Sequence, residues 1–129
     1  MNAQEHPFTV GNILTSNLEF SHLWCEQFFR LSGNANKRLH SFQGEQIVQG
    51  SAILTRLDSE LSRLLPENID VCIRSVTFRK PIRMDEPFLL FLECTQQNES
   101  STEIVATITS LNKETILVTA EFHLSKSEI

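Results

Sequence analysis

Apolar residues recur with helical spacing in two stretches of the chain. From Ser21 to Gly33 one stripe, which we expect to be buried, is formed by Leu23, Trp24, Phe28 and Leu31. Ser21 is suited to cap the start of this helix and Gly33 to end it. The more regular stretch runs from about Ser51 to Leu65 and stops before Pro66, which cannot continue a helix. The pattern therefore predicts two helices, of which the second is the main one.

The second helix is expected to be amphipathic. At about 100° per residue, one arc of its surface holds Ile53, Leu57, Leu61 and Leu64. A narrow polar stripe follows, with Ser51, Thr55, Asp58 and Ser62. The third face carries Arg56, Glu60 and Arg63, and we expect these charges to meet solvent or a neighbouring subunit.

After Pro66 the hydrophobic period changes to two, which is typical of strands. Ile69, Val71 and Ile73 alternate, and a phase shift near Ser75 indicates a bulge. The run PFLLFLEC from Pro87 is apolar enough to be buried on both faces, and alternation returns in residues 104–108 and 116–124. Residues 8–20 are mixed and extended, and could supply a further strand. The polar residues 34–44 are expected to form a loop.

One main helix and about four strands joined by short polar connections predict an α+β fold, an antiparallel sheet against one long helix. A chain of 129 residues without a linker or repeat predicts a single domain over residues 1–129. No apolar run approaches the roughly 20 residues of a membrane span. The start MNAQEHPFTV lacks the features of a targeting peptide, so we expect a cytoplasmic protein that does not insert into membranes.

The net charge and the cysteines limit which partners and sites this chain is expected to have. A formal net charge of -5 argues against a general nucleic-acid binder. Cys25, Cys72 and Cys94 are widely spaced in apolar surroundings, which predicts reduced thiols that act as small hydrophobic residues and no metal site.

Basic residues gather in one short segment of this acidic chain. Four of the eleven Lys and Arg residues fall within ten positions, Arg74, Arg79, Lys80 and Arg83. They could form the outward face of a strand or an anion site.

Three segments resemble the MaoC-like dehydratase branch of the hot-dog fold superfamily, in which an antiparallel sheet wraps one long central helix. FFRLSGNANKRLH, residues 28–40, is similar to the family's helix-to-loop signature of an aromatic residue, Leu-Ser-Gly-Asp, Asn and a later His. IVQGSAILTRLDSELSRLL from Ile47 is similar to the Ile-Val-His-Gly opening of its central helix. VTFRKPIRMDEPFLLFLEC from Val76 is similar to its Phe-x-x-Pro-Val segment with a following Asp.

The resemblance implies an enzyme of acyl thioesters that adds water to 2-enoyl groups or removes it from 3-hydroxyacyl groups. Its loop Asp and His would correspond to Asn34 and His40, and the amide of Gly50 would stabilise the thioester oxygen. The basic cluster would then bind phosphates of coenzyme A or of an acyl carrier protein. No cofactor beyond the substrate's own coenzyme A or phosphopantetheine is implied.

This sequence departs from the family pattern at several positions. Asn34 replaces the Asp and cannot accept a proton near neutral pH. His40 lies one residue further on than usual, Gln49 replaces the His before the helix glycine, and Met84 replaces a frequent Gly. His40 alone could act as base, with Asn34 holding the water or hydroxyl.

Two other functions remain open. The segment GSAILTRLD, residues 50–58, is similar to the helix start of hot-dog thioesterases of the phenylacetate type, and Asp58 would then be their catalytic carboxylate. The other open function is that of a catalytically silent protein that binds acyl groups. Because an isolated sheet of this kind leaves one edge and part of its helix uncovered, a homodimer is expected in each case.

Overall fold

The computed structural model describes residues 8–32, 41–42 and 45–127. In chain order its elements are β1 (Ile13–Glu19), α1 (His22–Ser32), β2 (Ser41–Phe42), β3 (Glu45–Gln46), α2 (Gly50–Arg63), β4 (Ile69–Phe78), β5 (Pro87–Gln97), β6 (Ser101–Thr109) and β7 (Ile116–Lys126). Within these ranges we found no helix with the length and apolar character that a membrane crossing requires.

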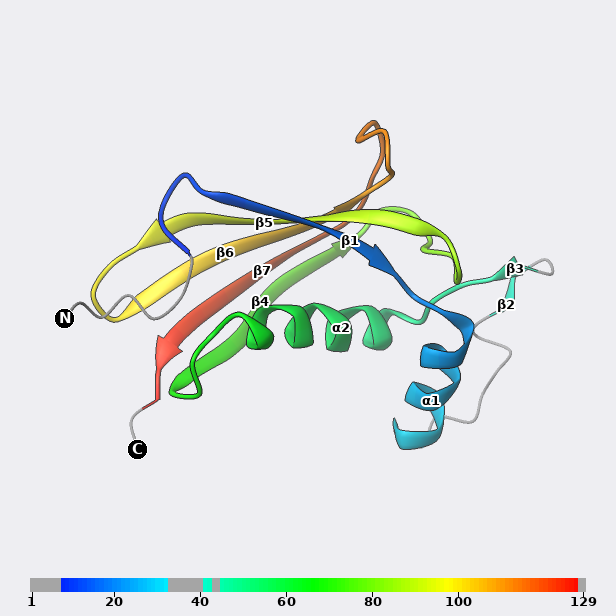
Figure 1. The fold of residues 1–129 in the computed structure, drawn as a ribbon, viewed down its shortest axis with the longest axis horizontal. Helices are drawn as coiled ribbons and strands as arrows, with labels where there is room; N and C mark the ends of the chain where they lie inside the picture. The colour runs from blue at the N-terminus through cyan, green and yellow to red at the C-terminus, as the bar shows by residue number, and fades with distance from the viewer. Residues whose placement is uncertain (1–7, 33–40, 43–44, 128–129) are drawn as a thin grey trace.

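Five strands form one antiparallel sheet in the order β1-β5-β6-β7-β4. The sheet curves over one side of α2, and α1 lies beyond the N-terminal end of that helix (Figure 1). This is the α+β architecture expected from the sequence. The early extended segment is an edge strand, β1, and β4 is the opposite edge.

The core lies between α2 and the concave face of the sheet. The buried residues of α2 are Ala52, Ile53, Leu57 and Leu61, which belong to one cluster with the inward residues of β5, β6 and β7. Burial of apolar surface at about 25 cal/mol per Å² makes this layer the main source of stability. It also fixes where the start of α2 lies relative to the sheet.

Several local expectations are confirmed. The hydroxyl of Ser21 accepts a hydrogen bond from the Trp24 N–H at 3.0 Å, so Ser21 caps α1. The register of β4 against β7 shifts between Ile73 and Ser75, where a bulge was predicted.

Other expectations are wrong. The stripe of α1 is buried only in part, since Leu23 is 64% exposed and Leu31 89%. In β5 only alternate residues are fully buried, because only its concave face packs on the core. Residues 41–42 of the predicted loop form the two-residue strand β2, which pairs with β3 just after the loop. Cys72 is exposed on the edge strand β4, whereas Cys25 and Cys94 are buried as predicted.

Two residues on the charged face of α2 are also less exposed to solvent than expected. The Arg56 side chain is 22% exposed and Glu60 17%, because this part of the helix packs beside β1 and α1. Burial raises the pKa of Glu60, but hydrogen bonds from Arg63 and Arg56 lower it by more, so the net pKa lies below its usual value.

Candidate functional site

The start of α2 combines polar backbone groups with an adjacent hollow. The hollow measures about 380 Å³ and is lined by Ile47, Val48, Gly50, Ile53, Phe78, Arg79, Lys80, Pro81 and Ile82. Its walls are mostly apolar, and two cationic residues belong to the lining. A volume of this size falls within the range of small-molecule sites.

The backbone at this helix start leaves donors available. Gln49, the N-cap residue, is extended, with φ -65° and ψ 144°. Its carbonyl accepts hydrogen bonds from the Ala52 and Ile53 N–H groups at 3.0 and 3.1 Å. Within the described part of the chain, the N–H groups of Gly50 and Ser51 have no acceptor. The first amides of a helix carry the positive end of its dipole, so this point favours a developing negative charge.

Gly50 packs closely against the end of β4. A Cβ at this position would lie 3.2 Å from Cζ of Phe78, the last residue of β4. The ring is 47% exposed and forms one wall of the hollow, so Phe78 sets how closely a ligand can approach the amide. The hydropathy pattern of the chain contains no signal for this role, since Phe78 reads as an ordinary strand residue.

Gln49 contributes a second polar feature. Its side-chain oxygen Oε1 is buried, and no donor among the described residues reaches it. The side chain makes no capping hydrogen bond to α2. A buried acceptor without a donor costs about 1–3 kcal/mol, so among the described residues this atom makes a destabilising contribution.

The structure separates the four basic residues that cluster in the sequence. Arg79 and Lys80 line the hollow, where both of their N–H groups donate to the Leu117 carbonyl, at 2.7 and 3.2 Å. Neither side chain forms an ion pair with another described residue. These two residues keep their charge available to an anion.

The other two basic residues are engaged with carboxylates. Arg74 Nε lies 3.7 Å from Glu103 Oε1, and the guanidinium also reaches His123 on the outward side of the sheet. Arg83 Nη1 lies 3.8 Å from Glu86 Oε2. Neither residue lines the hollow beside Gly50.

Asp58 is not brought to the hollow. Its Oδ1 accepts a hydrogen bond from the Ser62 hydroxyl at 3.0 Å, one turn further along α2. Eight residues of helix put it about 12 Å from Gly50 along the axis. The two other predicted catalytic residues, Asn34 and His40, lie outside the described residues.

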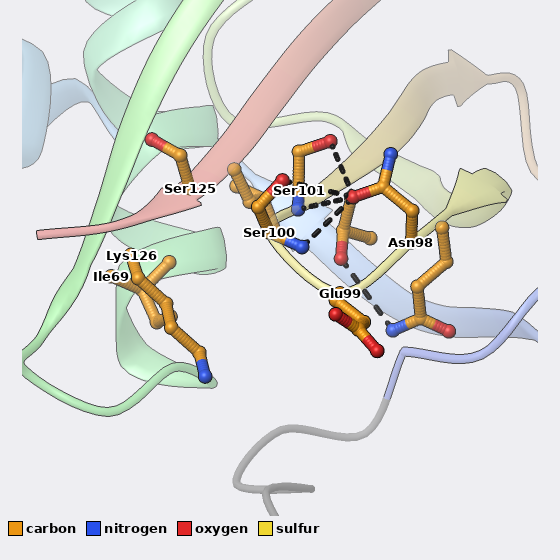
Figure 2. A pocket seen from close by; sticks show the side chains of 10 residues that line it. Ile69, Asn98, Glu99, Ser100, Ser101, Ser125 and Lys126 are labelled. Carbon is orange, nitrogen blue, oxygen red and sulfur yellow. Dashed lines mark hydrogen bonds between the residues drawn. The ribbon is translucent and has the colours of Figure 1, made fainter.

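A larger hollow of about 700 Å³ lies at the other end of the sheet, where β5 turns into β6 (Figure 2). Its polar groups mostly satisfy one another: Asn98 Oδ1 accepts hydrogen bonds from the N–H and hydroxyl groups of both Ser100 and Ser101, at 2.8–3.4 Å. Lys126 and Ile69 lie across the hollow from this turn. It offers neither a helix start nor a free pair of cations, so the smaller hollow is the better candidate.

Comparison with known proteins places the fold. No family model matches the chain, and no curated protein sequence matches it. Among solved structures, it is similar to the (R)-hydratase from A. caviae involved in PHA biosynthesis, at 19% identity and a TM-score of 0.77, over 92% of this chain and 97% of that one. It is also similar to R-hydratase PhaJ1 from Pseudomonas aeruginosa, at 14% identity and a TM-score of 0.78, over 95% and 84%.

A thioesterase has the same architecture. The fluoroacetyl-CoA thioesterase FlK matches at 6% identity and a TM-score of 0.64, over 92% of this chain and 87% of that one. At these identities the likeness is one of fold. The hot-dog fold expected from the three sequence segments is thereby confirmed.

Proposed function

We propose that this protein is an acyl-thioester hydratase or dehydratase that acts on 2-enoyl or 3-hydroxyacyl thioesters. The observation that carries the proposal is the start of α2, where Gly50, whose N–H has no acceptor among the described residues, lines an apolar hollow together with two cationic residues. The shared fold with two (R)-hydratases supports it.

The chemistry follows from where charge develops. When water adds to C3 of an enoyl thioester, electrons move to the thioester oxygen, and an N–H donor at a helix start stabilises that negative charge. His40 takes the proton from the attacking water and returns it to C2, while the Asn34 amide holds the water. The reaction uses no metal ion and no redox cofactor.

Arg79 and Lys80 are suited to bind the phosphates of coenzyme A or of a carrier's phosphopantetheine. Arg79→Gln is expected to raise KM for crotonyl-CoA but not for crotonyl-pantetheine, which lacks the phosphates. Arg74→Gln is the matched control, because Arg74 already pairs with Glu103. Equal effects of both variants would contradict this assignment.

We further propose a homodimer formed through β4. This ten-residue strand is a sheet edge, and among the described residues nothing pairs with its outer side. Ile73 on it is 39% exposed. Ile73→Lys should halve the mass measured by light scattering, whereas Ile13→Lys on the opposite edge strand should not. A monomeric wild type would refute the dimer.

The alternative is a thioesterase that uses Asp58. The fold shared with FlK supports this alternative, but Asp58 lies away from the hollow and is hydrogen-bonded within its own helix. A nucleophile or base must be within hydrogen-bonding reach of its target, so a second subunit would have to supply the remainder of that site. The geometry therefore favours the hydratase.

One assay separates these functions and the catalytically silent acyl binder. Crotonyl-CoA and butyryl-CoA are incubated with the protein while enoyl absorbance and release of free thiol are followed. Loss of enoyl absorbance that His40→Ala abolishes and Asp58→Ala spares is the expected result. Thiol release with the reverse dependence would establish the thioesterase, and neither signal above background would exclude both enzymes.

A further inference from the structure

The two walls of the hollow beside Gly50 are tied to each other through the backbone. One wall is the segment 47–50 and the other is the segment 78–82, and both contribute lining residues. The Val48 N–H of the first wall donates a hydrogen bond to the Ile82 carbonyl of the second at 2.8 Å. The distance between the walls is therefore restrained by the main chain and not by side-chain packing alone.

Phe78 belongs to the second wall and points the tip of its ring at Gly50. The ring atoms Cζ, Cε2 and Cε1 lie 3.2, 3.5 and 3.6 Å from the position that a Cβ on Gly50 would take. The backbone that carries the ring is held in the sheet, because Phe78 pairs with Val118 of β7 and the next N–H, that of Arg79, donates to the Leu117 carbonyl at 2.7 Å. The ring is thus in close contact with the residue that carries the proposed oxyanion donor.

The inner side of the hollow is closed by buried apolar side chains. Val48, Ile53 and Ile82 line it, and all three are buried in the core. Protein interiors are close-packed, with few voids larger than a water molecule. An acyl group that meets the Phe78 ring therefore cannot move deeper into the protein to avoid it.

The proposed function determines which part of the substrate comes near Phe78. In that function the thioester oxygen accepts a hydrogen bond from the Gly50 N–H, and such a bond is about 2.9 Å long. C2 of the acyl group is two bonds from that oxygen, so it is bound close to Gly50, where the ring bounds the hollow. An unbranched 2-enoyl thioester carries one hydrogen on C2, whereas a branched one carries an alkyl group there.

We infer that Phe78 is a specificity-determining residue, whose ring faces C2 of the bound acyl group and selects thioesters that are unbranched at this carbon. The inference rests on the proposed function for the position of the thioester at Gly50. One methylene group more or less in an apolar pocket changes discrimination about 10- to 200-fold. Because the Phe78 ring is half-exposed and can turn partly aside, the expected effect is at the lower end of this range.

The test uses butyryl-CoA and isobutyryl-CoA, which have the same composition and differ only in branching at C2. Neither acyl group has a double bond to which water could add, so titration calorimetry measures their dissociation constants without hydration. The variants are Phe78→Ala and Ile116→Ala. Ile116 is the matched control, because it is 45% exposed where Phe78 is 47% exposed, precedes Leu117 at the same end of the sheet, and does not line the hollow.

The wild type is expected to bind butyryl-CoA about tenfold more tightly than isobutyryl-CoA. In Phe78→Ala this ratio should fall to about one, because the ring that meets the branch is gone, and in Ile116→Ala it should stay at about ten. Phe78→Leu keeps an apolar side chain but lacks the outer ring atoms, so its ratio should also fall. This second variant decides the matter if Phe78→Ala does not fold.

Equal affinities of the wild type for the two thioesters, or a ratio that Phe78→Ala leaves unchanged, would overturn the inference. So would an equal fall of the ratio in Ile116→Ala, or a wild type that binds neither thioester. If the ratios are as expected but crotonyl-CoA is not hydrated, the proposed function fails while the inference stands, and the hollow is then an acyl-binding site without hydratase activity.

Discussion

Replacing Gly50 by proline removes one backbone N–H from the start of α2 and leaves the remainder of the helix unchanged. Gly50 is the first helical residue, where proline is well tolerated because that N–H has no partner within the helix. Gln49 already has the extended conformation, φ -65° and ψ 144°, that a residue before proline requires. The substitution is therefore directed at the proposed oxyanion donor.

The loss of activity in Gly50→Pro is measured relative to Gly50→Ala. Both variants add a Cβ, which meets Cζ of Phe78 at 3.2 Å, so both require the half-exposed ring to shift by a few tenths of an ångström. Alanine keeps the N–H and gains up to about 1 kcal/mol of helix propensity. Loss of one oxyanion donor lowers kcat about 10²- to 10³-fold, or about 2.7–4 kcal/mol. Proline should show this loss relative to alanine.

The assay is the initial rate of crotonyl-CoA hydration, with circular dichroism and thermal melting to verify that both variants fold. We expect Gly50→Ala to keep most of the activity. If Gly50→Pro folds and its kcat lies less than about tenfold below that of Gly50→Ala, a difference under about 1.4 kcal/mol, the Gly50 amide is not the oxyanion donor.

Three further predictions concern stability and reactivity. Gln49→Met removes the buried unpartnered oxygen and should raise the unfolding free energy by about 1 kcal/mol in urea titrations; unchanged or lower stability would contradict this. A thiol reagent at mildly alkaline pH should label only Cys72 in the folded protein, because burial raises the pKa of Cys25 to about 11 and also raises that of Cys94; labelling of all three at equal rates would refute it. Glu60→Gln should lower the melting temperature at neutral pH. Since the pKa of Glu60 lies below its usual 4.5 in the folded protein, the wild-type advantage should decline as pH falls below 4.5 and vanish below that lowered pKa, and an advantage that does not decline there would contradict the ion pairs.

The main helix and the central strands were predictable because each has a single buried face. The arc that contains Leu57 and Leu61 specifies α2, and alternation specifies β4, β6 and β7, down to the bulge near Ser75. The burial of β5 was overestimated for a related reason. An unbroken apolar run fits two buried faces, yet the sheet has a helix on only one of them.

The candidate site was less predictable, because sequence neighbours need not be spatial neighbours. Arg74 lies at the bulge of β4 and turns to Glu103 on the outward side, while Arg79 and Lys80 follow the end of the same strand and reach the hollow. Arg56 is the opposite case, because its neighbours in space are distant in the sequence. Its partners Glu19, Phe20 and Trp24 are more than thirty positions away, so helical periodicity alone assigned it to solvent or a neighbouring subunit.

The separation of the clustered basic residues and the misassignment of Arg56 have one physical cause, which also bears on the proposed function. Periodicity predicts which side chains leave water, but a guanidinium can leave water only where carbonyls, carboxylates or aromatic faces replace its hydration. Arg56 finds all three, Arg74 and Arg83 find a carboxylate, and Arg79 and Lys80 find no such partner among the described residues. Of the four basic residues that cluster in the sequence, the two without a carboxylate partner among the described residues are the two that line the hollow beside Gly50, and this is where we propose that the anionic groups of a coenzyme A substrate bind.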